Sequence, residues 1–235
     1  MKLSYPEWEK TVCMEEQDIP VISMENPLYH YDRLMELYRQ IQGDTGGFVL
    51  FEEETHLDLR KKSVLLLSPL DMDFNNRKIL TKLFAALREE AMTESFYRET
   101  RTAMGNILTY AEHLSQQVPL PLTYDMDVDL IEMMKAIHLR IDMEGTNLPE
   151  QMLSFMKNWN ILFGETCFFF HGFRDFLPKE IKESFYNNAL EEKLQFILLE
   201  GKCYDKIELE NLLLLMKIYV KFLSKFLPYP NCTAK

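Results

Sequence analysis

Thr166-Cys-Phe-Phe-Phe170 and Leu194-Gln-Phe-Ile-Leu-Leu199 are two short runs rich in apolar residues, and they decide the fold. Between them, Pro178 begins a segment with helical spacing of its apolar residues, which predicts a helix over residues 178–190. Strand, helix and strand in this order form a right-handed crossover unit. Because continuously apolar strands are typical of parallel sheets buried on both faces, this part of the chain predicts an α/β fold.

Neighbouring segments extend this pattern. Gly47-Phe-Val-Leu-Phe51 and Val64-Leu-Leu-Leu-Ser68 are further apolar runs of the kind that belongs to buried strands of parallel sheets. A helix at Val128–Ile137, a short strand at Leu139–Asp142 and a helix at Pro149–Trp159 complete the predicted order. We therefore expect an α/β head with a mostly parallel sheet.

Residues 75–117 differ from the rest, because they contain no proline, a single glycine and apolar residues at helical spacing. They predict a hairpin-like helical leg, bent near Met92–Phe96 or at Gly105. Val118-Pro-Leu-Pro-Leu122 then ends the helical pattern, since prolines cannot continue a helix. The predicted domains are an α/β head, residues 1–70 and 118–235, and an inserted helical leg, residues 71–117.

Composition limits the class of function. The chain has 235 residues, and 26 basic against 37 acidic side chains give a net charge of −11, which disfavours a protein that coats nucleic acid indiscriminately. Any DNA contact needs a local basic surface. Four widely spaced cysteines and the absence of a signal peptide predict reduced thiols in a cytoplasmic protein. The apolar run Leu212–Leu227 contains lysines and is too short to span a bilayer.

Motifs for catalysis are missing. Gly43-Asp-Thr-Gly-Gly47 precedes a strand and lacks the lysine that ends a phosphate-binding loop, so a plain turn is the better interpretation. The five histidines show no helical metal-binding spacing, and no Gly-x-Ser-x-Gly motif occurs. Nothing in the sequence argues for an enzyme.

An acidic segment, Tyr124-Asp-Met-Asp-Val-Asp129, has two interpretations. Its alternating carboxylates could present hard oxygen ligands to calcium, although the spacing is not that of an EF-hand. Alternatively, Asp127 caps a helix that begins at Val128, and Asp129 favours the positive end of that helix. Both interpretations stay open. Glu52-Glu53-Glu54 predicts a solvated turn, or part of a cation site at a subunit interface.

Basic residues gather in the middle of the chain. Arg60-Lys61-Lys62 directly precedes a predicted strand, and Arg77, Lys78, Lys82 and Arg88 lie on the first leg helix. These residues either follow a phosphate backbone or simply increase solubility. They do not fall on one narrow stripe, so a single chain makes a weak DNA site that a symmetric oligomer would multiply.

Residues Leu212–Phe226 carry a lysine at every fourth position, which predicts a terminal amphipathic helix. Packing against the head or a neighbouring subunit is the expected role of this helix, and lying on an anionic membrane is the alternative.

The order of these features resembles the CRISPR-associated ring protein of type II-A adaptation modules. The similarity covers residues 45–200. The segments that carry it are Phe48-Val-Leu-Phe51, Arg60-Lys-Lys62, Val64 to Leu67, Leu70-Asp-Met-Asp-Phe-Asn-Asn-Arg-Lys-Ile-Leu80, Leu122-Thr-Tyr-Asp125, Leu130-Ile-Glu-Met-Met-Lys135, Leu139-Arg-Ile-Asp142, Cys167-Phe-Phe-Phe170, Leu177-Pro-Lys-Glu180 and Phe196-Ile-Leu-Leu-Glu200.

The resemblance implies an α/β head related to a degenerate P-loop NTPase fold without a working phosphate loop, together with a helical leg. It implies a homotetrameric ring that needs calcium (Ca²⁺), encircles double-stranded DNA, prefers its ends and has no catalytic activity. Its role would be spacer acquisition in antiviral defence. The implied partners are the CRISPR adaptation integrase and the RNA-guided effector nuclease, and no membrane.

Site residues follow from the same resemblance. The implied metal ligands are Asp125, Asp127, Asp129 and Glu132, and the implied DNA-binding residues are Arg60, Lys61 and Lys62, followed by Arg77, Lys78 and Lys135. Two segments depart from the family pattern. Glu52-Glu53-Glu54 is acidic where relatives begin a basic loop, and residues 201–235 do not match the usual ending.

Two other functions remain to be distinguished from a DNA-binding ring. One is a protein–protein scaffold that uses the leg and the terminal helix without DNA. The other is a metal-dependent nuclease that uses the cluster from Asp125 to Glu132, for which no second group of catalytic carboxylates is evident.

Overall fold

The computed structural model describes residues 1–14, 17–202, 204–205 and 207–215. Contacts divide the described chain into two compact units. We call the first the α/β unit; it comprises Met1–Met72 and the described residues from Met143 onward. The second, the helical unit, comprises Asp73–Asp142 and is an insertion in the first.

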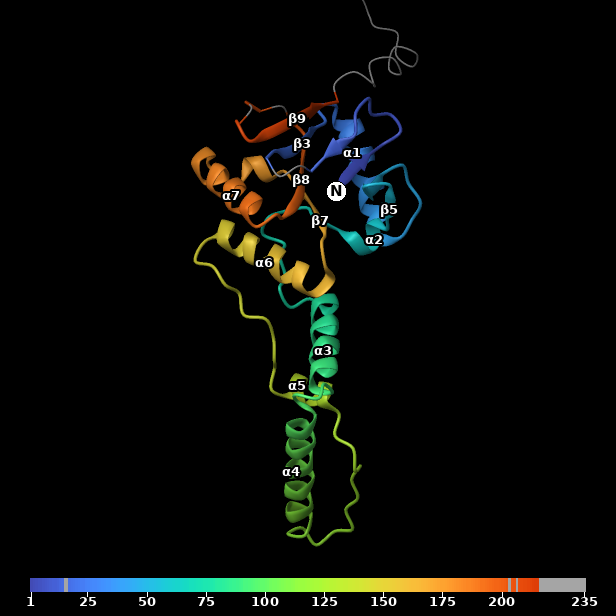
Figure 1. Ribbon diagram of the computed structural model, residues 1–235, viewed down its shortest axis with the longest axis vertical. Helices are drawn as coiled ribbons and strands as arrows, with labels where there is room; N and C mark the ends of the chain where they lie inside the picture. The colour runs from blue at the N-terminus through green and yellow to red at the C-terminus, as the bar shows by residue number, and fades with distance from the viewer. Residues whose placement is uncertain (15–16, 203, 206, 216–235) are drawn as a thin grey trace, which may run out of the picture. The chain divides into compact units, whose positions relative to one another are not determined.

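Five strands form a parallel sheet in the α/β unit, in the order β6-β7-β8-β3-β9, with every neighbouring pair parallel (Figure 1). The predicted runs at 64–68, 166–170 and 194–199 supply three of these strands. The α/β class with its parallel sheet is thereby confirmed. The strands are β3 (Ile19–Ser23), β6 (Ser63–Leu66), β7 (Cys167–His171), β8 (Gln195–Glu200) and β9 (Glu210–Leu214).

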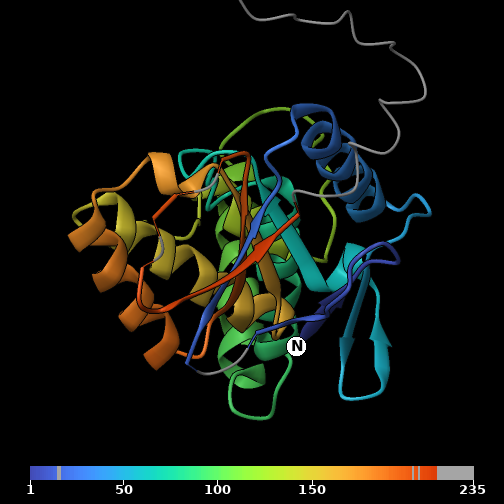
Figure 2. The same ribbon diagram turned by 90° about the horizontal axis from the view of Figure 1, so that it is seen from above.

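Helices cover both faces of this sheet. Figure 2 shows α6 and α7 on one side and α1 on the other. Helix α7 connects β7 to β8, so the predicted crossover unit is confirmed. The bounds are α1 (Pro27–Gln42), α6 (Leu148–Phe163) and α7 (Lys179–Glu191), with a short 3-10 turn, η1 (Phe173–Asp175), directly after β7.

The core follows the alternation of side chains along β7. Phe168 packs against the aromatic rings of Phe155 and Trp159 on α6, whereas Phe169 joins the cluster that includes Tyr29 of α1. Consecutive residues of a strand point to opposite faces, so a continuously apolar strand needs cover on both sides. This explains why the all-apolar sequence of β7 lies in the middle of the α/β layers.

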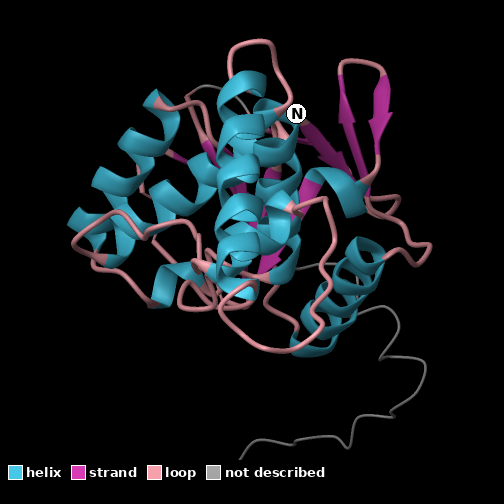
Figure 3. Ribbon diagram, turned by 90° about the horizontal axis from the view of Figure 1, so that it is seen from below, coloured by secondary structure: helices cyan, strands magenta, loops and turns pink. Residues whose placement is uncertain are grey.

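A second sheet in the α/β unit is antiparallel, with the order β2-β1-β4-β5. Its strands appear in magenta in Figure 3. Placing Gly47–Phe51 with the parallel-sheet strands was therefore wrong. Only one face of that segment is deeply buried, at Leu50, which suits an antiparallel strand. The bounds are β1 (Lys2–Ser4), β2 (Val12–Cys13), β4 (Val49–Glu52) and β5 (Thr55–Leu57), and the short helix α2 (Leu59–Lys62) leads from β5 to β6.

The end of the described chain also differs from expectation. Glu210–Leu214 forms strand β9 at the sheet edge, so a helix that begins at Leu212 is wrong. A short apolar run fits a buried strand or a helix equally well, and pairing with β3 decides between them. The rest of the predicted helix lies outside the described residues. Among the helices of the described part of the chain, none is long and apolar enough to cross a bilayer.

The helical unit contains α3 (Arg77–Ala91), α4 (Tyr97–Ser115) and α5 (Leu130–Ala136). The break between α3 and α4 falls at Met92–Phe96, as predicted, whereas Gly105 lies inside α4. Figure 1 shows α4 continuing from α3 instead of folding back as a hairpin, and the chain returns through the segment after α4 and through α5. The two prolines of that segment keep it out of helical conformation.

Residues 118–142 belong to the helical unit, which differs from the predicted domain boundary at residue 118. Helix α5 packs on α3, and Asn75 joins the two ends of the unit. Its side-chain amide donates to the Ile141 carbonyl at 3.0 Å and accepts from the Ile141 N–H at 2.8 Å. This pairing satisfies the backbone of Ile141, and the predicted strand at Leu139–Asp142 does not form.

Candidate functional site

The first group of predicted DNA-binding residues forms α2. Asp58 caps this helix by accepting a hydrogen bond from the Arg60 N–H, and Leu59 anchors it in the core. Arg60 and Lys61 are exposed, and Lys62 is half-buried with its ammonium 3.3 Å from the Glu165 carbonyl. Arg60 lies 3.6 Å from the carboxylate of Asp58, an exposed pair of little energetic weight. The segment therefore presents positive charge to solvent on a fixed helical turn.

The second group of predicted DNA-binding residues lies in the helical unit. Arg77 and Lys78 occupy the first turn of α3, which Asn76 caps. Partial desolvation lowers the pKa of the Lys78 ammonium. Lys135 on α5 donates to Glu132 at 2.6 Å, so its charge is compensated locally. Both groups are thus placed on helices, but in different units of the protein.

Two of the four predicted metal ligands, Asp129 and Glu132, are used for other contacts. Asp129, and not Asp127, is the N-cap of α5, where its side chain accepts from the backbone N–H groups of Ile131 and Glu132. The Glu132 carboxylate pairs with Lys135. Asp125 is exposed in the segment that precedes α5. The capping interpretation therefore holds for this segment, two residues later than predicted.

A pocket of about 260 Å³ in the helical unit brings arginines to the same acidic segment. Arg88 of α3 and Arg101 of α4 line it together with Asp127 and Asp129. Cationic side chains beside these carboxylates compete with a bound calcium ion. Within the described residues, no three His, Cys, Asp or Glu side chains group closely enough to hold a metal. The predicted ligands of one chain do not fit a complete calcium site.

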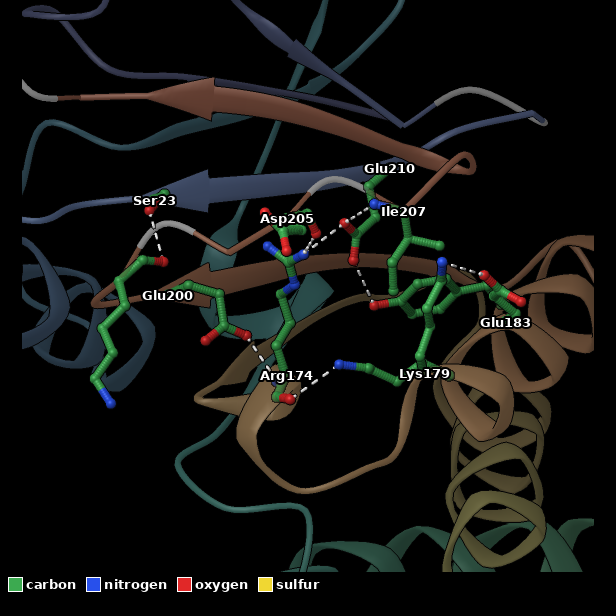
Figure 4. A network of polar contacts seen from close by, with 11 residues as sticks. Ser23, Arg174, Lys179, Glu183, Glu200, Asp205, Ile207 and Glu210 are labelled. Atoms are coloured by element: carbon green, nitrogen blue, oxygen red, sulfur yellow. Dashed lines mark hydrogen bonds and ion pairs between the residues drawn. The ribbon is translucent and has the colours of Figure 1, made fainter.

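A buried polar network, which the sequence analysis missed, joins η1, α7 and β9 (Figure 4). Arg174 forms an ion pair with Glu210 at 2.9 Å, and both side chains are only 1 % exposed. The Arg174 N–H donates to the carboxylate of Glu200 at 2.9 Å, and its guanidinium donates to the Asp205 carbonyl at 2.6 Å. Tyr186 donates to Glu210 at 2.9 Å. Because the network is closed to solvent, its charges are compensated by one another and not by water.

Burial controls the ionisation of this network. Removal from water raises the pKa of Glu200 to about 7, against the opposing effect of Arg174. Burial also raises the pKa of Tyr186, and the charge of Glu210 adds to the effect. A sequence signal existed for Glu200, which directly follows the apolar run Phe196–Leu199, where an isolated charge must find a partner.

In a P-loop fold the phosphate-binding loop joins a strand to the following helix, and here the segment between β3 and α1 has this position. The chain passes from β3 to α1 through residues 24–26, which contain no glycine. The Asn26 side chain already accepts from the N–H groups of Leu28 and Tyr29 at the start of α1. These N–H groups are the donors that would bind a phosphate. The likeness to a degenerate P-loop NTPase fold stays a prediction, with no phosphate loop at this position.

Comparison with models of protein families identifies the family of this chain. The family model described as CRISPR-associated protein (Cas_Csn2) matches residues 40–217, which is more than half of the chain. The matched range includes α2, the whole helical unit and four strands of the parallel sheet. A search of the curated proteins finds no match.

Proposed function

The chain belongs to the Cas_Csn2 family of CRISPR-associated proteins, which act in CRISPR adaptation. From this membership we propose that the chain is a non-enzymatic protein of spacer acquisition that binds double-stranded DNA. It acts in the cytoplasm as a calcium-dependent homotetrameric ring. It works beside the adaptation integrase and the RNA-guided effector nuclease. The observation that carries this proposal is the family match over residues 40–217.

The basic turn α2 supports the DNA-binding part of the proposal. Arg60 and Lys61 are exposed, although the chain as a whole carries a net charge of −11. A local cationic segment on an acidic protein restricts phosphate contacts to the surface where it lies. Repetition of the segment by symmetry adds phosphate contacts, so affinity for duplex falls steeply as salt rises.

Reversing the charge of α2 tests this assignment. The variant Arg60→Glu, Lys61→Glu, Lys62→Glu should bind linear duplex at least about tenfold more weakly and with a shallower salt dependence, because phosphate contacts are lost. Fluorescence anisotropy with labelled duplex at several salt concentrations measures both quantities. The matched control is Lys2→Glu, Lys10→Glu, Lys179→Glu, which changes the net charge equally. Equal affinities of the two variants would contradict the role of α2.

The surface of the helical unit supports self-assembly. This unit buries few large apolar side chains and exposes many, which is typical of a surface that is covered in an oligomer. The exposed side chains include Met92, Phe96, Tyr97, Ile107, Tyr110, Leu114, Val118, Leu120, Leu122, Tyr124, Met126 and Ile137. The calcium part of the proposal needs ligands from more than one protomer, since the described residues of one chain provide no group of three.

Light scattering tests assembly. With calcium, the mass should be about four times that of the 27.9 kDa chain, and chelator should reduce it. Tyr110→Ser with Leu114→Ser on α4 should also reduce the mass, because it removes apolar contact area. The control, Leu28→Ser with Tyr31→Ser on α1, removes similarly exposed side chains and should keep the tetramer. A chelator-insensitive monomer that ignores duplex would leave a protein–protein scaffold.

A further inference from the structure

Two histidines that are distant in sequence lie against one another in the α/β unit. His30 is in the first turns of α1, and His171 is the last residue of β7. Their Nε2 atoms are 3.0 Å apart, across a separation of 141 positions. Both residues therefore lie where the parallel strands end, the edge at which α/β sheets usually bind their ligands.

The other nitrogen of each ring lies close to backbone groups. The Nδ1 atom of His171 faces the Leu67 carbonyl at 3.4 Å. His30 Nδ1 is buried without a well-aligned hydrogen bond, beside the backbone of Met24 and Glu200. His171 matches the arrangement of metal-binding histidines, in which a carbonyl that takes the proton on Nδ1 leaves the lone pair of Nε2 free to bind. Here both Nε2 atoms point to one place.

The positions of the ring protons decide how the two histidines interact. Burial lowers the pKa of His30, and the adjacent His171 lowers it further. Neutral imidazole is the form that binds transition metals. With one proton between the two Nε2 atoms the pair is a simple hydrogen bond, whereas with both protons on Nδ1 the two lone pairs need a cation between them.

We propose that His30 and His171 form a zinc-binding site at the carboxyl edge of the parallel sheet, with water completing the coordination. Two imidazole nitrogens bound at about 2.0–2.1 Å to one tetrahedral zinc ion lie about 3.3 Å apart, so the observed pair needs to separate by only a few tenths of an ångström. Both rings are half-buried, which leaves one side of the site open to water.

This site differs in chemistry from the calcium of the proposed function. Calcium takes oxygen ligands, whereas imidazole nitrogen favours zinc and its neighbours among the transition metals. The zinc ion would join α1 to β7 directly. Because binding favours the folded chain, zinc should raise the melting temperature of the α/β unit.

The test is calorimetric titration of chelator-treated full-length protein with zinc chloride, together with thermal unfolding. The wild-type protein should bind one zinc ion per chain with micromolar affinity and gain several degrees in melting temperature. His30→Ala and His171→Ala should each weaken binding at least tenfold and abolish the gain. The controls His113→Ala and His138→Ala, in the helical unit, should bind as the wild type does, and calcium should not compete.

If either alanine variant fails to fold, NMR of the histidine ring signals in the wild-type protein still tests the proposal. Zinc should shift the signals of two histidines, with no such change on adding calcium. Absence of zinc binding by the wild type, unchanged binding in His30→Ala and His171→Ala, or shifts of other histidines would overturn the proposal.

Discussion

Arg174→Met should lower the free energy of unfolding by about 3–5 kcal/mol, because it leaves a buried carboxylate without its partner. The side chains of Arg174 and Glu210 are each 1 % exposed and lie 2.9 Å apart. Removal of the guanidinium leaves the Glu210 carboxyl group with only the Tyr186 hydroxyl and the Ile207 N–H as partners, in a site that water does not reach. The same change also removes the donor to the Asp205 carbonyl at 2.6 Å.

Urea unfolding followed by circular dichroism measures this effect. Adding Glu210→Gln to Arg174→Met should recover part of the loss, since a neutral amide is less costly to bury than an unpaired charge. Lys157→Met is the control, because the Lys157 ammonium also forms a close ion pair, 2.6 Å from the Glu192 carboxylate, but on the surface. It should cost no more than about 1 kcal/mol. Equal stabilities of Arg174→Met and Lys157→Met would show that the buried pair contributes nothing.

Glu200→Gln should change how stability depends on pH. Burial raises the pKa of Glu200 in the folded protein to about 7, above its ordinary value of 4.5. Between these two pH values the folded chain keeps a proton that the unfolded chain has released. Stability of the wild type therefore falls as pH rises from 4.5 to 7, by about 3 kcal/mol from this residue. Glutamine stays neutral and can still accept from the Arg174 N–H, so the variant lacks this decline.

The free energy of unfolding, measured in urea at pH 5, 6, 7 and 8, checks this prediction. Glu200→Gln and the wild type should be similarly stable at pH 5, and the variant should be the more stable of the two at pH 8. The control is Glu192→Gln on the surface of α7's C-terminal end, which should leave the pH profile unchanged. A wild-type profile that does not depend on Glu200 would place the pKa of this carboxyl near its ordinary value.

Elements of the fold could be predicted from the sequence where their own residues determine them, and not where distant residues do. Strands β7 and β8 could be predicted because each contains four consecutive apolar residues, which need cover on both faces. The interior strand β3, which lies between β8 and β9, was missed, since Pro20 interrupts its short run and proline is unusual inside sheets. Strand β4 was found but placed with the wrong sheet, because its partner β1 is set by long-range pairing that periodicity does not report.

The candidate sites show the same division. The helix after the acidic segment could be predicted, and the cap moved by only two residues, to Asp129. The pairing of His30 with His171 could not, since it joins residues 141 positions apart. The ion pair of Arg174 with Glu210 could not be predicted either, because only the folded chain shows which buried charges contact one another. Motif spacing finds sites built on one element and misses those built between elements.

The order of strands in the parallel sheet has a consequence for synthesis on the ribosome. Strand β3 is made early, but both of its neighbours, β8 and β9, are among the last described segments. Ser23 and its hydrogen-bond partner Lys202 are 179 positions apart. At an elongation rate of about 5–20 residues per second, roughly 10–40 s pass between the synthesis of β3 and that of its neighbouring strands. Strand β3 can therefore pair only after β8 and β9 have been synthesised, and both of its edges stay unpaired until then.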